Sequence, residues 1–199
     1  MIAILDYGAG NLFSVKNALD FLGFDSVITA ERAALAQADK LILPGVGAFP
    51  DAMQKLEATG LADAIIREAA RKPLLGICLG MQLLFDFGFE FEKTRGLGLI
   101  AGRVDLIEAP GLKIPHIGWS DVKRGAPCPL SREIKEGDRL YFVHSYKAVT
   151  DARHIALSTE YGDLIPALVF RGKVFGCQFH PEKSGTVGLG ILRAFCELE

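Results

Sequence analysis

The sequence predicts an α/β protein with a three-layer, doubly wound and mostly parallel sheet, to which antiparallel strands are added. Short apolar runs typical of buried strands alternate with helical spacing over residues 1–85. After about Gly98 the segments become shorter, β-rich and separated by Gly, Pro and charged turns. Half of the 199 residues are hydrophobic, which suits one domain, residues 1–199, with a sizeable core.

The first half begins with a strand at 2–5, and apolar residues at 12, 15, 19 and 22 then recur at helical spacing until Gly23. The later elements are expected as a strand at 26–29, a short helix near 33, a strand at 40–43, helices at 50–58 and 61–70, and a strand that runs into Cys78. In a doubly wound sheet the ligand site lies at the carboxyl ends of the strands. The loop at 44–49 and the turn at Cys78 are both expected there.

The second half is predicted to contain antiparallel strands within 99–108, 140–149 and 155–159, all added to the same sheet. Apolar residues at 187, 191, 192 and 195 predict a closing amphipathic helix over 187–198. We find no linker-like stretch and no internal repeat, so one domain is expected.

Charge and composition exclude several classes of function. The chain has 22 basic and 24 acidic side chains, so nucleic acid and acidic membranes are not expected as partners. Residues 1–6 are too short and too soon polar for a signal peptide, and no apolar run approaches the roughly 18 residues of a membrane helix. We therefore expect a soluble, cytoplasmic protein.

Neither a metal nor a cofactor is predicted. The four cysteines form no C-x-x-C pair and the four histidines no helical H-x-x-x-H pair. His116 and His144 lie in apolar β segments and are interpreted as satisfied core residues, and His154 as a surface residue. The turn GAGN at 8–11 resembles the start of a dinucleotide fingerprint, but Phe13 occupies the position of its third glycine.

Cys78 is the strongest candidate for chemistry. It lies in the sequence GICLGMQ at 76–82, between an apolar strand and the apolar stretch 83–85, which predicts a sharp turn from a strand into a helix. Glycines two positions before and after it would let strand and helix approach closely, and the helix N-terminus would favour thiolate over thiol. Taken alone, a free cysteine is more often part of a core.

A base for Cys78 is predicted in the sequence GCQFHPEKS at 176–184. Pro181 disfavours helix at His180, so His180 and Glu182 are expected two apart on extended backbone, projecting to the same side. An imidazole oriented by a carboxylate is the second half of a Cys/His/acid triad. An isolated H-P-E string is more often a surface turn, and the elbow around Cys78 is what favours the triad.

The loop PGVG at 44–47 provides the third part. Its two glycines permit backbone conformations that other residues resist, and their amides can approach a ligand closely. We expect an oxyanion hole with one donor from this loop, at Val46 and Gly47, and the other from the backbone amide of Leu79. An ordinary Pro-Gly turn is the alternative, and a loop this flexible could depend on a partner or substrate for its productive geometry.

Together these parts resemble class I glutamine amidotransferases, in which a G-x-C-x-G-x-Q elbow and an H-P-E segment carry the triad. The matching segments are DYGAGNL at 6–12, PGVGAF at 44–49, GICLGMQLLF at 76–85, PHIGW at 115–119, YFVHSY at 141–146 and QFHPEKS at 178–184. The resemblance runs nearly end to end and implies the flavodoxin-like fold of that class. Within the class the chain looks like the glutaminase subunits of imidazole glycerol phosphate synthases. One departure is Ser120, where the family usually has Asn.

The resemblance implies that Cys78 is the nucleophile, His180 the general base and acid, and Glu182 the partner that orients His180. The thiolate would attack the side-chain amide carbon of glutamine, His180 would protonate the departing ammonia, and water would hydrolyse the glutamyl thioester. In bulk water at neutral pH the ammonia would mostly become ammonium, so the enzyme would need a docked acceptor and a sheltered route.

The resemblance also implies how the substrate is held. Gln82 and Glu90 would bind glutamine, and the backbone around Ser145 and Tyr146 would meet its carboxylate. No cofactor is implied.

The implied acceptor is a (β/α)₈-barrel cyclase subunit in a heterodimer. It would use the ammonia to make imidazole glycerol phosphate and aminoimidazole carboxamide ribotide in histidine biosynthesis. Asn11, Trp119 and Lys183 match positions that the family places at or near this interface. From the sequence alone, Asn11 would be a helix N-cap and Trp119 a core aromatic residue.

Two other functions remain open at this point. The chain could be the glutaminase of another amidotransferase such as anthranilate synthase, although the elbow there more often reads CLGHQ. It could also be a flavodoxin-like binding or regulatory module that retains the fold with an inert thiol.

Overall fold

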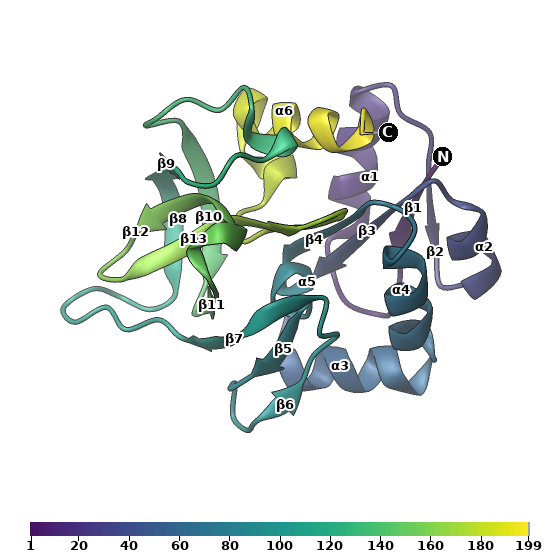
Figure 1. Ribbon diagram of the computed structural model, residues 1–199, viewed down its shortest axis with the longest axis horizontal. Helices are drawn as coiled ribbons and strands as arrows, with labels where there is room; N and C mark the ends of the chain where they lie inside the picture. Colours follow the sequence, from purple (N-terminus) through teal and green to yellow (C-terminus); the bar gives the residue numbers. More distant parts are fainter. Residues whose placement is uncertain (199) are drawn as a thin grey trace.

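A computed structural model describes residues 1–198 of the chain, and Figure 1 shows its arrangement. Within that range the central sheet has eight strands in the order β2-β1-β3-β4-β14-β13-β12-β9. These strands are β1 (Ile2–Leu5), β2 (Ser26–Thr29), β3 (Lys40–Gly45), β4 (Leu74–Cys78), β9 (Lys123–Arg124), β12 (Ile155–Glu160), β13 (Leu164–Arg171) and β14 (Val174–Cys177). Pairing is parallel from β2 through to β14 and antiparallel from β14 to β9. The predicted mostly parallel sheet with added antiparallel strands is confirmed.

Helices cover both faces of this sheet, which makes the fold three-layered (Figure 1). The helices are α1 (Leu12–Phe21), α2 (Arg32–Gln37), α3 (Phe49–Ala58), α4 (Leu61–Ala69), α5 (Leu79–Gln82) and α6 (Gly185–Cys196), with short 3-10 turns η1 (Pro129–Ser131), η2 (Ala152–His154) and η3 (Pro181–Lys183). Alternate residues of β1 separate two buried cores. Ile2 and Ile4 share a core with α1 and α6, whereas Ala3 and Leu5 share one with α2, α3 and α4.

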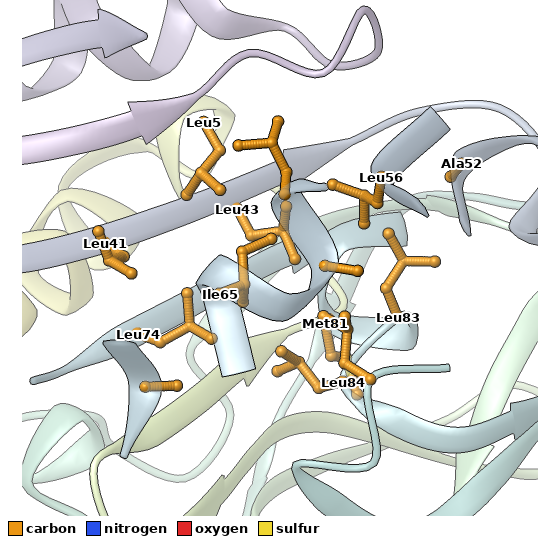
Figure 2. Close-up of a cluster of buried hydrophobic side chains, with 14 of the residues drawn as sticks. Leu5, Leu41, Leu43, Ala52, Leu56, Ile65, Leu74, Met81, Leu83 and Leu84 are labelled. Atoms are coloured by element: carbon orange, nitrogen blue, oxygen red, sulfur yellow. The ribbon is translucent and has the colours of Figure 1, made fainter. Parts of the chain in front are cut away.

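The second of these cores is drawn in Figure 2, where Leu43 and Leu74 of the sheet lie in one cluster with Ile65 of α4. The sequence of α4 explains its orientation, because its buried residues Leu61, Ile65 and Ala69 recur every four positions along one stripe. Packing on both faces holds the central strands rigid. The loops at their carboxyl ends are therefore set on a fixed frame.

Two smaller sheets contain strands that we expected in the central one. The first pairs β8 (His116–Asp121) with β10 (Arg139–His144), and the second has the order β11-β7-β5-β6, with β5 (Phe85–Gly88), β6 (Thr94–Arg95), β7 (Ile100–Leu106) and β11 (Tyr146–Val149). The 140–149 segment is β-rich as predicted, but the expectation that it joins the central sheet was wrong, because the chain bends at Ser145 and sends β10 and β11 into two other sheets. Of the three predicted regions, 155–159 alone joins the central sheet.

Residues 1–198 contain neither a membrane-spanning helix nor a metal-binding cluster. No helix in this range is both long and apolar enough to cross a bilayer. In the same range, no cluster of three or more His, Cys, Asp or Glu residues is placed to hold a metal ion.

Candidate active site

Cys78 occupies the turn between β4 and α5, with φ of 55° and ψ of −113°. This conformation is strained for a residue with a side chain, and such strain costs of order 1–3 kcal/mol. A Cβ on Gly80 would lie 1.8 Å from the carbonyl oxygen of Leu43, and one on Gly76 would lie 2.5 Å from that of Gly80. The predicted close approach of strand and helix, which requires glycine on both sides of Cys78, is confirmed.

The helix after Cys78 is shorter than predicted. α5 ends at Gln82, and β5 begins at Phe85, so the apolar stretch is a buried connection and not the body of a helix. The macrodipole is a sum over successive peptide units, and one turn contributes little. The expectation that a helix N-terminus favours the thiolate stays a prediction, and it applies to a helix of a single turn.

His180 and Glu182 form the expected pair, with 2.9 Å between His180 Nδ1 and Glu182 Oε1. Their side chains are 5% and 1% exposed. The backbone is extended at His180, with φ of −96° and ψ of 99°, but Glu182 lies in η3, so the prediction of extended backbone was wrong there. Pro181 has its φ fixed near the helical value and begins this turn, which carries the carboxylate to the imidazole.

The pKa of His180 is raised from 6.5 to about 9. Burial by itself lowers this pKa. Hydrogen bonds with Cys78 and Glu182, together with the negative charges of both groups, raise the pKa by more than burial lowers it. At neutral pH His180 is thus a cation. A cationic imidazole stabilises a neighbouring thiolate and holds the proton that a leaving amine requires.

A cavity of about 330 Å³ lies beside Cys78. The predicted residues that line it are Val46, Gly47, Cys78, Leu79, Gln82, Glu90, Ser145, Tyr146 and His180, and the lining is completed by Pro115, Val143 and His144. The structure thus brings together the predicted nucleophile, base, oxyanion loop and glutamine-binding residues. Their individual roles remain predictions.

The predicted oxyanion loop is fixed at one end and open at the other. The Tyr7 hydroxyl donates to the carbonyl oxygen of Pro44 at 2.9 Å, which anchors the start of the loop. Gly47 has φ of 100°, in the left-handed region that favours glycine, and a Cβ there would meet no described atom within 4 Å. The backbone amides near Gly47 therefore have room to turn toward a ligand.

Gln82 is held by two hydrogen bonds from its amide nitrogen. Nε2 donates to the carbonyl oxygen of Tyr146 at 3.1 Å and to Oε1 of Gln178 at 3.0 Å. A backbone carbonyl can only accept, so the nitrogen must face Tyr146 and the amide oxygen is left for the cavity. Gln82 therefore offers a substrate an acceptor and not a donor.

Glu90 connects the cavity to the loop. Its Oε2 accepts a hydrogen bond from the backbone amide of Phe49 at 2.7 Å. Phe49 begins α3, where amides lack partners within the helix and a negative charge is favourable. One carboxylate oxygen is thus committed to the end of the 44–49 loop, and the other is left for the cavity that Glu90 lines.

A chain of neutral histidines supports the same carbonyl of Tyr146. His144 Nδ1 lies 2.8 Å from that oxygen, His144 Nε2 lies 3.1 Å from His116 Nδ1, and His116 Nε2 lies 2.8 Å from Ser120 Oγ. Because the carbonyl only accepts, each donor along the chain is fixed in turn, and the Ser120 hydroxyl must donate. Burial lowers the pKa of His116, and it lowers that of His144 to about 4. Both histidines are the satisfied core residues that the sequence predicted.

Three residues near the site were missed by sequence reasoning, namely Tyr7, Gln178 and Ser184. Ser184 Oγ donates to the carbonyl oxygen of His180 at 2.6 Å and accepts from the amide of Tyr141 at 3.0 Å. The sequence signal that could have found these residues is their position inside the segments DYGAGNL and QFHPEKS, which carry the family resemblance. Residue type alone does not distinguish them from ordinary buried polar groups.

The three predicted interface residues lie outside the lining of the cavity. Trp119 is 46% exposed, so the interpretation as a core aromatic residue was wrong. Asn11 does stand at the N-cap of α1, although its side chain makes no capping hydrogen bond within the described chain. Lys183, in η3, is exposed. The places of Trp119 and Lys183 leave them available to a partner, and an interface role is still a prediction.

Comparison with known proteins identifies the family. Residues 3–197 match the family model of class-I glutamine amidotransferases. The solved crystal structure of a glutamine amidotransferase superposes with a TM-score of 0.77 at 21% identity, covering 98% of this chain and 97% of that one. The structure of PurLQS from Thermotoga maritima superposes with a TM-score of 0.73 at 23% identity, covering 98% of this chain and 96% of that one. The chain belongs to the class-I glutamine amidotransferase family.

Relatives within the family share a more particular name. A protein of Caldanaerobacter subterraneus is 49% identical, over 100% of this chain and 98% of its own length. One of Geobacillus kaustophilus is 51% identical, over 98% of this chain and 95% of its own length. Both are named imidazole glycerol phosphate synthase subunit HisH.

Proposed function

We propose that this chain is the glutaminase subunit of an imidazole glycerol phosphate synthase. It hydrolyses glutamine to glutamate and ammonia and passes the ammonia to a synthase partner. The observation that carries the proposal is the meeting of a strained cysteine elbow with a buried, cationic His180 and its carboxylate partner at one 330 Å³ cavity. The full-length likeness to proteins named as subunits of this synthase supports the choice of client.

The reaction follows from the ionisation of the site. The thiolate of Cys78 attacks the side-chain amide carbon of glutamine, and amides of the 44–49 loop and Leu79 stabilise the resulting oxyanion. Cationic His180 donates its proton to the nitrogen, and ammonia leaves as the carbon–nitrogen bond breaks. Neutral His180 then takes a proton from water, which attacks the thioester. Glutamate is released, and the thiolate and imidazolium are restored.

The partner is a (β/α)₈-barrel cyclase subunit in a heterodimer, and the products of the complex are imidazole glycerol phosphate and aminoimidazole carboxamide ribotide. The surface with Trp119, Lys183 and Asn11 is the docking face in this proposal, since all three lie outside the cavity and two of them are exposed. The proposal takes residues 1–199 as a single domain, which the match over 3–197 supports. It also places the reaction in the cytoplasm, as expected from the sequence.

The test uses Cys78→Ala in the complex with the cyclase. Synthesis fed by glutamine should fall to background, whereas synthesis fed by ammonia should persist, because the cyclase does not need the thiol. Cys128→Ala is the matched control, since Cys128 is also buried and lies outside the cavity lining. Loss of both activities in Cys78→Ala would contradict the division of labour.

The identity of the client is tested separately by affinity capture with the tagged chain. Recovery of a barrel cyclase supports the proposal, and recovery of a chorismate-using enzyme would assign the chain to an anthranilate-type synthase. The inert-module alternative is tested with a glutamine-analogue diazo-ketone. If Cys78 stays unmodified even with the partner present, the chain is not a glutaminase.

A further inference from the structure

Gln178 lies behind the catalytic cysteine and is fully buried. It follows β14 directly and stands two residues before His180. Its Nε2 lies 3.8 Å from Cys78 Sγ, and its Oε1 lies 3.0 Å from Gln82 Nε2. One side chain therefore contacts both the nucleophile and a residue of the substrate cavity.

The polarity of these contacts is determined by a backbone group. The carbonyl of Tyr146 only accepts, so Gln82 turns its nitrogen toward it and uses the second hydrogen of that nitrogen on Gln178. Gln178 must then present its oxygen to Gln82 and its nitrogen to the sulfur of Cys78. The carbonyl of Tyr146 therefore sets the orientation of the Gln178 amide, and this orientation places the N–H donor of Gln178 against Cys78.

Packing alone does not account for an amide here. Its neighbours along the chain, Cys177 and Phe179, are fully buried apolar residues, and a buried amide is costly unless its hydrogen bonds are made. The backbone amide of Gln178 is already satisfied by the carbonyl of Ala167. Both recorded side-chain partners, Gln82 and Cys78, line the cavity.

We propose that Gln178 is a positioning residue for the nucleophile: its amide donates a hydrogen bond to the sulfur of Cys78 and holds the thiolate in place, while its oxygen orients Gln82. The inference rests on the proposed function, in which Cys78 attacks glutamine. Hydrogen bonds to ionised groups are stronger than those between neutral groups, so this contact favours the thiolate over the thiol. The same sulfur lies 3.9 Å from the carbonyl oxygen of Val143, to which the thiol form donates.

The test follows alkylation of Cys78 by iodoacetamide as a function of pH in the isolated chain, with the signal of Cys78→Ala subtracted to remove the other cysteines. Gln178→Met, which loses donor and acceptor, should react about tenfold more slowly near neutral pH, with its pH profile moved upward. Gln178→Glu keeps an acceptor for Gln82 but places a carboxylate against the sulfur, so its shift should be at least as large. A role limited to orienting Gln82 predicts a wild-type rate for Gln178→Met, because the hydrogen bonds of Gln82 go to Tyr146 and Gln178 and not to the sulfur.

Thr159→Val is the matched structural control, because Thr159 is also buried and donates to the carbonyl of Asp121 at 2.8 Å, away from the cavity. It should lose stability without any change in the alkylation profile. If Gln178→Met reacts like wild type, the inference is wrong, and if Gln178→Met does not fold, Gln178→Leu, which also removes the donor without adding a charge, decides. A wild-type chain whose Cys78 resists both iodoacetamide and the diazo-ketone would instead contradict the proposed function.

Discussion

The two sides of Cys78 are built from different chemistry. On one side lies a charged arm, defined as His180 and Glu182, whose pair is 2.9 Å apart and nearly closed to solvent. On the other side lies a neutral arm, in which hydrogen bonds converge on the carbonyl of Tyr146. Its members are Gln178, Gln82, His144, His116 and Ser120.

The charged arm and the neutral arm are suited to different roles. In the proposed reaction a positive His180 stabilises the thiolate and carries the proton, so it would act on the chemical step. The neutral arm carries no charge to transfer. It fixes the directions of donors and acceptors, and it can do so because the buried histidines stay uncharged. Losses in the charged arm should therefore appear in kcat, and most losses in the neutral arm in KM or stability.

The largest effect is expected from removal of the base. His180→Asn should lower kcat for glutamine hydrolysis about 10³- to 10⁴-fold, because both proton transfers lose their carrier. The measurement is steady-state glutaminase activity in the complex. His154→Asn is the control, since His154 makes its hydrogen bond with the carbonyl of Phe170, away from the cavity. A loss below tenfold in His180→Asn would mean that another group serves as the base.

The second prediction separates the arms by pH. The pKa of His180 is raised to about 9, above the ordinary 6.5, so its stabilising contribution is complete below about pH 6.5 and is lost as pH rises through about 9. Burial lowers the pKa of His144 to about 4, so its contribution is complete above about pH 6.5 and is lost as pH falls through about 4. Each proton changes the free energy of unfolding by about 1.4 kcal/mol per pH unit within its window.

Denaturant unfolding from about pH 4 to about pH 10 measures both windows. His180→Asn should flatten the alkaline slope and reduce the acid slope only slightly, because burial is the main cause of the lowered His144 pKa and the charge of His180 a minor one. His144→Asn should flatten the acid slope and leave the alkaline slope in place. Because burial lowers the pKa of His116 as well, some acid slope should survive in His144→Asn. If both variants flatten the same side, the two arms are not electrostatically distinct.

The third prediction concerns substrate binding by the neutral arm. Gln82→Met removes an acceptor from the cavity and leaves the carbonyl of Tyr146 and Oε1 of Gln178 short of a donor. We expect KM for glutamine to rise about tenfold to a hundredfold, with kcat changed only a few-fold. Gln54→Met is the control, because Gln54 is exposed on α3 and outside the cavity. An equal fall in kcat would place Gln82 in the chemical step.

Local pattern was enough to predict the parallel half of the fold. The strand at 26–29 has the predicted bounds. β3 is two residues longer than predicted, and its extra residues Pro44 and Gly45 extend its pairing with β4 as far as Cys78. Buried parallel strands are continuous apolar runs, so composition marks them directly. The antiparallel half was predicted less well. β11 pairs with β7, some forty residues earlier, and nothing in either sequence specifies that partner.

The candidate site shows the same division. Cys78, His180 and Glu182 could be found from the sequence because residue type and local spacing together define a nucleophile and an oriented base. The neutral arm could not, because its contacts join distant positions: Gln82 and Gln178 are 96 residues apart, and their hydrogen bond depends on how two elements pack. The helix predicted after Cys78 is present as α5, but its end could not be predicted, since apolar residues in a short buried run do not distinguish helix from strand.

The smallest effect is expected at the outer end of the neutral arm, at Ser120, where the family resemblance implies Asn. Ser120→Ala removes the donor to His116 Nε2 and should lower the free energy of unfolding by about 1 kcal/mol. Ser120→Asn, the residue that the resemblance implies at this position, keeps an N–H donor and should lie within a few tenths of a kcal/mol of wild type. Ser and Asn share the ability to donate a hydrogen bond to His116 Nε2.

Nitrogen NMR of the imidazoles provides the decisive readout for this last pair. In wild type and Ser120→Asn, His116 should carry its proton on Nδ1 and accept at Nε2, because the carbonyl of Tyr146 fixes the direction of the whole chain. In Ser120→Ala the accepting Nε2 should lose its hydrogen-bonded signal, while the tautomer of His144 persists. A reversed tautomer in wild type would mean that the carbonyl of Tyr146 does not set the direction of these hydrogen bonds. The donor assignment at Gln82, which relies on the same carbonyl, would then lose its support.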